Sequence, residues 1–221
     1  MIVTIDGPAS SGKTTVAKLL AKELGFLVLE SGKFYRLFTY LLLKSEKEWR
    51  ALLTDEERLK AFWKRILPEL KIKVKKEGTA VYFRGELLEK ELRLPEVEEA
   101  VSIVAKVEAV RKLVNSLLRE LSKDKKLVAE GRDMGSVVFP EATLKIFLTA
   151  DEKVRAERRA KDEGRPFEKV AENIKKRDKI DSTRKTAPLT IPEGAIVIDT
   201  TSLSPEEVLK VVIKELHKRG L

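Results

Sequence analysis

The chain has 221 residues, which suits one folding unit with one or two small insertions and is short for two independent domains. It contains no Cys and one His, His217, so disulfides, iron–sulfur clusters and thiolate-bound zinc are excluded, and a His-based triad or metal cage is disfavoured. A net charge of +9 favours an anionic partner: a nucleic acid, an acidic membrane surface or a phosphorylated substrate. No apolar run reaches the roughly 18 residues of a membrane span, and the N-terminus lacks signal-peptide features, so we expect a cytoplasmic protein without membrane contact.

Residues 1–30 are predicted to form a strand, a glycine-rich turn, a helix and a second strand. Residues 2–5 and 26–29 are short apolar runs, and apolar side chains at helical spacing lie between them. Gly25 is a typical helix stop.

The turn in this segment matches the phosphate-binding pattern G-x-x-x-x-G-K-[ST] at every fixed position. Its glycines let backbone N–H groups surround the phosphates, and the helix N-terminus adds the positive end of its dipole. Lys13 then reaches the β- and γ-phosphates, and the Thr14 hydroxyl can ligate Mg²⁺. A nucleoside triphosphate is therefore expected at Gly7, Pro8, Ala9, Ser10, Ser11, Gly12, Lys13, Thr14 and Thr15. A regulatory GTPase or a motor is disfavoured, because the sequence has no N-K-x-D motif and no long second domain.

A small antiparallel insertion is predicted in the middle of the chain. Residues 71–74 and 81–84 flank a turn at Glu77 and Gly78, and Gly85 precedes a third possible strand. Two helix starts carry capping-box patterns, Thr54 with Glu57 and Ser204 with Glu207, and Pro205 suits a first helical position. We expect Trp49 and Trp63 to pack in the interior rather than to stack on a base.

The second half of the chain returns to alternating strands and helices. Residues 127–129, 144–148 and 195–198 are apolar runs separated by helical patterns, which predicts an α/β protein with a doubly wound parallel sheet. Residues 151–185 are highly charged at helical spacing, with a break at Gly164 and Pro166, as in a mobile, solvated lid. On that lid Arg155, Arg158 and Arg159 share one helix face, which either faces solvent or contacts a γ-phosphate.

Three further stretches resemble the bacterial cytidylate kinases. They are LESGKFYR at 29–36, EGRDMGSVVFP at 130–140, and RDKIDSTR at 177–184 followed by Ala187-Pro188-Leu189; the insertion also ends like that family's, in LRLPEV at 92–97. With the phosphate-binding turn they cover essentially the whole chain in the family's order. The resemblance implies a P-loop NTPase-type, doubly wound five-stranded parallel sheet, with core segments 1–60, 96–150 and 186–221, a monophosphate-binding insertion at about 61–95 and a helical lid at about 151–185.

The resemblance also implies roles for individual residues. Arg36, Arg132 and Arg184 would surround the acceptor phosphate, because guanidinium groups bind phosphate oxygens in pairs and neutralise charge in the transition state. Arg177 and Asp181 would reach the ribose, although their spacing of four also fits an intrahelical ion pair. The implied acceptor site comprises Ser31, Tyr35, Arg36, Ser102, Arg111, Arg132, Asp133, Arg177, Asp181 and Arg184, and the implied catalytic set comprises Lys13, Arg132, Arg158 and Arg184.

Base recognition is implied for Ser102, Arg111 and Asp133. A carboxylate accepts a hydrogen bond from the N4 amino group of cytosine, whereas uracil places an oxygen there and leaves the buried charge unpaired. The expected preference for CMP over UMP is about 5- to 150-fold. Lys33 stands where the family usually has a small residue, and Leu94-Pro95 replaces its Thr-Pro, so both bear on the affinity of the acceptor site.

The expected reaction is ATP-dependent phosphorylation of CMP, and of dCMP, with Mg²⁺, by a monomer that binds no nucleic acid. A kinase of the same fold acting on UMP, dTMP, AMP or shikimate is the alternative. A basic nucleic-acid-binding protein that uses ATP as a switch is a second alternative, disfavoured because no RNA-recognition signature is present and acidic residues are spread among the basic ones.

Overall fold

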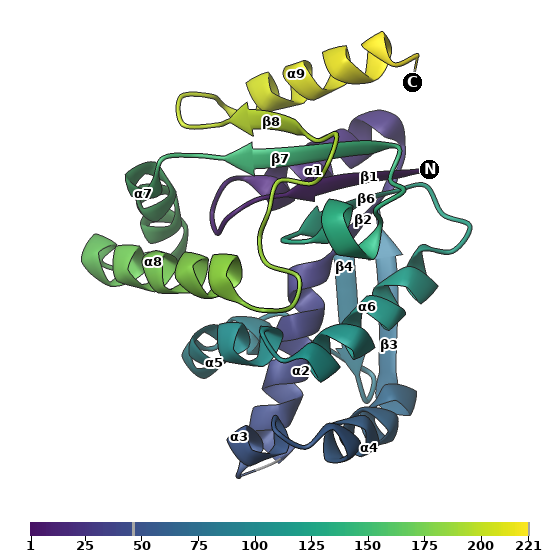
Figure 1. Ribbon diagram of the computed structural model, residues 1–221, viewed down its shortest axis with the longest axis vertical. Helices are drawn as coiled ribbons and strands as arrows, with labels where there is room; N and C mark the ends of the chain where they lie inside the picture. The colour runs from purple at the N-terminus through teal and green to yellow at the C-terminus, as the bar shows by residue number, and fades with distance from the viewer. Residues whose placement is uncertain (46, 221) are drawn as a thin grey trace.

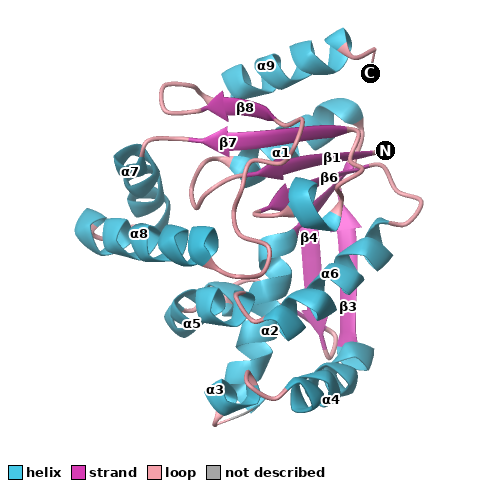
Figure 2. Cartoon of the chain, in the orientation of Figure 1, coloured by secondary structure: helices cyan, strands magenta, loops and turns pink. Residues whose placement is uncertain are grey.

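The computed structural model describes residues 1–45 and 47–220. Within these residues the core is a five-stranded parallel sheet with the order β2-β6-β1-β7-β8, seen in the upper half of Figures 1 and 2. Its strands are β1 (Ile2–Asp6), β2 (Leu27–Glu30), β6 (Leu127–Gly131), β7 (Leu144–Thr149) and β8 (Ile196–Asp199). The predicted doubly wound parallel sheet is confirmed. Because Asp6 lies opposite Gly131 in the register, the turn after β1 and the segment after β6 leave the sheet at the same edge.

Helices cover both faces of the parallel sheet, which is why its strands are apolar on both sides. One apolar cluster joins the sheet to α1 and α9, and another joins it to α2, α4, α5 and α6. The bounds of these helices are α1 (Lys13–Leu24), α2 (Ser31–Ser45), α4 (Glu56–Ile66), α5 (Pro95–Ala105), α6 (Glu108–Ser122) and α9 (Pro205–Lys218). Shorter helical elements are the α-helix α3 (Trp49–Leu52), the 3₁₀ turns η1 (Leu67–Glu69) and η2 (Glu91–Arg93), and the π-helical turn η3 (Met134–Val138).

The predicted insertion is an antiparallel sheet of β3 (Leu70–Lys75), β4 (Gly78–Phe83) and β5 (Glu86–Leu87), which projects downward from the parallel sheet in Figure 2. The third strand that the sequence suggested is therefore present. The insertion is fixed to β2 through Thr79, which is almost fully buried. The Thr79 hydroxyl accepts from the Glu30 backbone N–H at 3.0 Å and donates to the Val28 carbonyl at 2.9 Å, while the Glu30 carboxylate accepts from the Thr79 N–H at 2.7 Å.

Lys33 also contacts the residues that join the insertion to β2. Its ammonium group donates to the Thr79 carbonyl at 2.6 Å and lies 3.0 Å from the Glu30 carboxylate. It is not among the residues that line the central cleft. The residue that departs from the family pattern therefore contacts the insertion.

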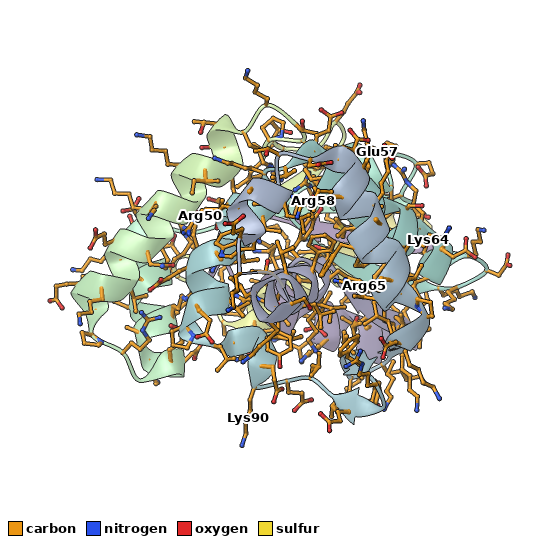
Figure 3. The ribbon with its side chains drawn as sticks, turned by 90° about the horizontal axis from the view of Figure 1, so that it is seen from below. Arg50, Glu57, Arg58, Lys64, Arg65 and Lys90 are labelled. Atoms are coloured by element: carbon orange, nitrogen blue, oxygen red, sulfur yellow. The ribbon has the colours of Figure 1, made fainter. Side chains whose placement is uncertain are left out.

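The lower end of the molecule is built around aromatic packing. Trp49 and Trp63 are 9% and 7% exposed, and Trp63 contacts Phe38 with ring centroids 5.2 Å apart, which confirms the packing prediction. Figure 3 views this end from below, with the exposed charged side chains Glu57 and Lys64 on the outer surface of α4.

One of the two predicted capping boxes is wrong. Helix α4 is capped by Asp55, whose carboxylate accepts from the Arg58 N–H at 3.0 Å, whereas Thr54 donates to the Ala51 carbonyl of the preceding turn. Asp55 is itself a strong N-cap residue and has extended backbone angles, so the helix begins one residue later than predicted. The box at Ser204 and Glu207 is confirmed, with Pro205 at the first helical position.

The segment predicted to form a lid, called the lid below, consists of α7 (Glu152–Glu163) and α8 (Phe167–Thr183), on the left of Figure 1. The predicted break is confirmed, because Gly164 ends α7 in a left-handed conformation with φ 62°. The lid is less solvated than its composition suggests: Ala156, Val170 and Ile174 form an apolar cluster with Ala9 of the phosphate-binding turn. Among the described residues, no helix has the length and apolar character to cross a membrane.

Candidate active site

Residues 7–14, the phosphate loop, leave β1 at the carboxyl edge of the sheet and lead directly into α1, as the sequence predicts. The loop has left-handed backbone at Gly12, with φ 88°, and at Ser10, with φ 59°. A side chain at Gly7 is impossible without rearrangement, because a Cβ atom there would lie 2.1 Å from the Leu148 carbonyl oxygen. The tight turn aims the N-terminus of α1 at the adjacent cleft, where an anion is stabilised by free N–H groups and the helix dipole.

Lys13 is buried at the base of this loop, with 5% of its surface exposed. Its ammonium group donates to the Pro8 carbonyl at 2.6 Å, within the loop itself. Burial, followed by the positive charge of Arg132, lowers the Lys13 pKa to about 7, although Glu130 and Asp6 act in the opposite direction. An anion in the loop would restore the ordinary protonation of Lys13.

Glu130 is an acidic residue of the site that sequence analysis did not single out. It is the second-last residue of β6, and its carboxylate accepts from the Thr14 hydroxyl at 3.2 Å. Burial raises the Glu130 pKa against the influence of Lys13. The Thr14 hydroxyl and the Glu130 carboxylate are oxygen ligands of the kind Mg²⁺ prefers when substrate phosphates complete its coordination. Within the described residues no group of three or more His, Cys, Asp or Glu side chains could hold a metal ion.

Arg132, Asp181 and Arg184 form another cluster in the lining of the cleft. The Asp181 carboxylate accepts from Arg132 Nε at 3.0 Å and lies 3.5 Å from Arg184 Nη1. The Arg184 Nε donates to the Ala187 carbonyl at 2.6 Å, but its Nη2 is buried without a hydrogen-bond partner in the described chain. Burial and the neighbouring Arg111 lower the Arg184 pKa. A buried donor without a partner next to excess positive charge fits an anionic ligand.

A second group of the predicted residues forms a polar pocket beside these arginines. Asp133 and Arg111 are 1% and 2% exposed and form a direct ion pair through Asp133 Oδ2. The Arg111 guanidinium lies over the Tyr35 ring, 5.1 Å from its centroid, and the Tyr35 hydroxyl is 3.4 Å from Asn115. Burial, followed by the charge of Asp133, raises the Tyr35 pKa, so the phenol stays neutral. A flat ligand with polar edges fits these groups.

Asp6 fixes the segment that carries Asp133. Its carboxylate oxygens accept from the backbone N–H groups of Met134, at 2.8 Å, and Gly135, at 2.7 Å. Burial raises the Asp6 pKa to about 6, because it outweighs these two hydrogen bonds. The end of β1, directly before the phosphate loop, is thus bonded to the residues directly after Asp133.

Arg36 and Arg177 point to the same carboxylate, that of Glu98 on α5. Arg177 Nη1 lies 3.1 Å from Glu98 Oε2, so the intrahelical pair with Asp181 that the spacing allowed is not formed. Arg177 Nε is a second buried donor without a partner in the described part of the chain.

The three lid arginines on the shared face have different environments. Arg155 is buried and bonds to the Ala150 and Ala9 carbonyls and to Asp178, so neither the solvent-facing nor the phosphate-contacting interpretation describes it. It fixes the lid to the phosphate loop. Arg158 lines the cleft and donates to the Thr200 carbonyl at 2.6 Å. Arg159 also lines the cleft and contacts Glu98 at 2.7 Å.

These groups surround one cleft of about 620 Å³. All predicted site residues line it except Gly7 and Pro8. The predicted residues in the lining are Ala9, Ser10, Ser11, Gly12, Lys13, Thr14, Thr15, Ser31, Tyr35, Arg36, Ser102, Arg111, Arg132, Asp133, Arg158, Arg177, Asp181 and Arg184. Such a cleft can hold a triphosphate at the loop and a second, anionic molecule at the arginines.

Four acidic residues that sequence analysis did not assign also shape the site. Glu130 and Asp178 lie in motifs that were already recognised. Asp6 is the last residue of β1 and Glu130 the second-last residue of β6, so both lie at the ligand edge of the sheet, which was an available signal. Asp178 accepts from the Ala9 N–H at 3.3 Å. Glu98 lies in a helix of ordinary amphipathic pattern, and nothing in the sequence pointed to it.

Curated proteins similar to this chain in sequence are cytidylate kinases. The chain is 42% identical to the cytidylate kinase of Caldanaerobacter subterraneus subsp. tengcongensis over 221 residues, covering 98% of this chain and 94% of that one. It is also 42% identical to the cytidylate kinase of Geobacillus sp. over 222 residues, covering 98% and 96%.

Solved structures share the fold at low sequence identity. A shikimate kinase from Bacteroides thetaiotaomicron matches with a TM-score of 0.50 at 13% identity, and an uncharacterised protein from Eubacterium ventriosum with 0.53 at 13%, each over 98% of both chains. The family model for cytidylate kinase matches residues 3–218, and the chain belongs to the cytidylate kinase family.

Proposed function

We propose that this protein transfers the γ-phosphoryl group of ATP to CMP, and to dCMP, giving CDP or dCDP and ADP. The observation that carries the proposal is the convergence of the phosphate loop and of Arg36, Arg132 and Arg184 on one cleft. Family membership supports the choice of CMP as the acceptor. The transfer would be direct and in line, so positioning and charge stabilisation are the work of the enzyme.

On the donor side, the amides of the phosphate loop and Lys13 would hold the β- and γ-phosphates. The Thr14 hydroxyl, 3.2 Å from the Glu130 carboxylate, would hold Mg²⁺ together with the phosphates. When bound, Mg²⁺ neutralises charge on the phosphate oxygens. Arg158 would complete this side from the lid, where it already borders the cleft.

On the acceptor side, Arg132 and Arg184 would bind the phosphate of CMP together with Arg36. The partnerless donor Arg184 Nη2 supports this assignment, because a phosphate oxygen would satisfy it. Arg177 and Asp181 would contact the ribose hydroxyls, again with a partnerless donor, Arg177 Nε, at the site.

For the base, Ser102, Arg111 and Asp133 would read cytosine, with Ser31 and Tyr35 lining the same side of the cleft. Arg111 binds Oδ2 of Asp133, and Oδ1 is the atom that we expect to accept from the N4 amino group. The Arg111–Asp133 pair is almost fully buried, which favours discrimination between an amino group and an oxygen.

Closure of α7 and α8 over the cleft would exclude the water that could otherwise accept the phosphoryl group. We propose that the enzyme works as a monomer in the cytoplasm, where ATP and nucleoside monophosphates are available, without binding nucleic acid or membranes.

An acceptor panel tests the proposal. CMP, dCMP, UMP, dTMP, AMP and shikimate are compared by kcat/KM with MgATP in a coupled ADP-release assay, and we expect CMP and dCMP to rank first. Lys13→Ala should reduce kcat by orders of magnitude, whereas Lys22→Ala, at an exposed position of the same helix, should leave it unchanged. A different leading acceptor would replace CMP in the proposal, and near-normal turnover of Lys13→Ala would refute the mechanism.

A further inference from the structure

Glu98 is a buried carboxylate that three arginines from three other helices contact. Its side chain is on α5 and is 8% exposed as a residue. Oε1 accepts from Arg36 of α2, and Oε2 accepts from Arg159 of α7 at 2.7 Å and Arg177 of α8 at 3.1 Å. Figure 1 shows α5 beside α2 and below the lid helix α8.

The position of Glu98 differs from that of its partners. Arg36, Arg159 and Arg177 all line the cleft, whereas Glu98 is not among the lining residues and supports them from behind. A carboxylate in this position orients guanidinium groups toward a ligand without touching the ligand itself.

The charges around Glu98 do not balance. The Glu98 carboxylate faces three guanidinium groups, of which Arg159 has a second acidic partner, Glu163, at 2.7 Å. Two carboxylates thus meet three guanidinium groups. Burial would raise the Glu98 pKa, but Arg36, Arg177 and Arg159 together bring it to about 2, so the group stays ionised. Burial and the charges of Arg36 and Arg159 lower the Arg177 pKa to about 10, which reflects the mutual repulsion of the arginines. Glu98 therefore holds together groups that would otherwise separate.

We propose that Glu98 is a positioning residue that holds the lid closed against the acceptor side of the cleft and orients Arg36 and Arg177 for the acceptor nucleotide. The lid is tied through Arg159 and Arg177, and the acceptor side through Arg36. The part of this inference that concerns the nucleotide rests on the proposed function, whereas the part that concerns lid closure does not.

Two other roles for Glu98 make different predictions. A carboxylate that merely occupies the phosphate site would compete with the acceptor, and its removal would lower KM for CMP. A carboxylate that only stabilises the fold would change the melting temperature without changing the lid position or KM. A positioning residue requires that removal opens the lid and raises KM.

The first measurement is the lid position without any ligand. Because the chain has no Cys, a pair of substitutions, Glu57→Cys on α4 and Lys175→Cys on α8, allows site-specific labelling for single-molecule energy transfer. Both positions are exposed, and Glu57 is labelled in Figure 3. In this background Glu98→Gln should shift the distribution toward longer distances. Glu99→Gln, the neighbouring exposed glutamate of the same helix, should not. Identical distributions for the two variants would overturn the proposal.

The second measurement is steady-state kinetics with CMP and MgATP. Loss of charge-assisted hydrogen bonds to three arginines should raise KM for CMP by about 10- to 100-fold in Glu98→Gln, with a smaller change in kcat and in KM for ATP. Glu98→Asp, which keeps the charge, should recover part of the loss. An unchanged or lower KM for CMP in Glu98→Gln would overturn the positioning role.

Arg159→Gln removes the contact to α7 while Glu98 stays in place, so it tests the lid contact even if Glu98→Gln folds poorly. It should also lengthen the distance between labels, and an unshifted distribution would contradict the lid contact. If no form of the protein phosphorylates CMP, the proposed function fails, but the energy-transfer result still decides whether Glu98 holds the lid.

Discussion

Binding of a nucleoside triphosphate should be coupled to proton uptake by Lys13. In the free protein the Lys13 pKa is lowered from 10.5 to about 7, first by burial and then by Arg132. The β- and γ-phosphates would supply the anionic partner that the ammonium group lacks, and would return the pKa toward its ordinary value. The perturbation is therefore pH, and the observable is the number of protons taken up on binding.

The magnitude follows from the shift. With a pKa of about 7 in the free protein, roughly one-tenth of Lys13 is protonated at pH 8, so binding takes up about 0.9 proton there and only about 0.1 at pH 6. The triphosphate-bound protein holds one more proton than the free protein. The affinity for the triphosphate should therefore weaken by up to about tenfold per pH unit above pH 7, which corresponds to about 1.4 kcal/mol.

Calorimetric titration with the magnesium complex of a non-hydrolysable ATP analogue, in buffers of different ionisation enthalpy, measures the uptake directly. Lys13→Arg is the matched control, because a guanidinium stays protonated over this pH range. The uptake that the wild type shows at pH 8 should be absent from the variant. Equal uptake in both proteins, or none in either, would refute the reasoning about Lys13.

Three further predictions concern the base site, the insertion and Asp6. Asp133→Asn should reduce the CMP/UMP ratio of kcat/KM by about 5- to 150-fold, and an unchanged ratio would remove Asp133 from base recognition. Thr79→Val should lower the free energy of unfolding in urea by about 2 kcal/mol, because it leaves the Glu30 N–H and the Val28 carbonyl without their partner. Thr79→Ser, which keeps the hydroxyl, should change it far less; equal losses would contradict this account. The pKa of Asp6 is 3.8 in the unfolded chain and about 6 in the folded protein, so the folded state binds the extra proton. Its contribution of up to about 3 kcal/mol is present below pH 4 and is lost as pH rises through 6. Asp6→Asn should remove that slope in urea unfolding series at pH 4–7, and parallel curves for the two proteins would be inconsistent with a buried, raised Asp6.

The parallel sheet and the phosphate loop could be predicted because their signals are local. Each strand is a short apolar run between helical patterns, and the loop is a contiguous pattern between one such strand and a helix. The helix start at Thr54 was wrong by one residue, since Asp55 competes for the same role within the same short segment.

The Glu98 contacts could not be predicted, because they join positions 61, 62 and 79 residues apart. Helical spacing suggested a pair between Arg177 and Asp181, but the fold brings Glu98 to Arg177 and turns Asp181 toward Arg132. Local spacing identifies which side chains can meet within a helix, and tertiary packing decides which of them do. The arginine motifs and the acidic residues Asp133 and Asp181 were visible in the sequence, whereas the Glu98 carboxylate was not.

The hydrogen bonds between Asp6 and the segment after Asp133 connect the donor side of the cleft directly to the acceptor side. The last residue of β1 holds the backbone of Met134 and Gly135, and the very next residue begins the loop that faces the donor. A small displacement of this strand end would carry both binding surfaces along and leave their separation unchanged. Thermal motion of the sheet edge would then be shared by donor and acceptor, which is the condition for keeping two reacting groups aligned on a flexible scaffold.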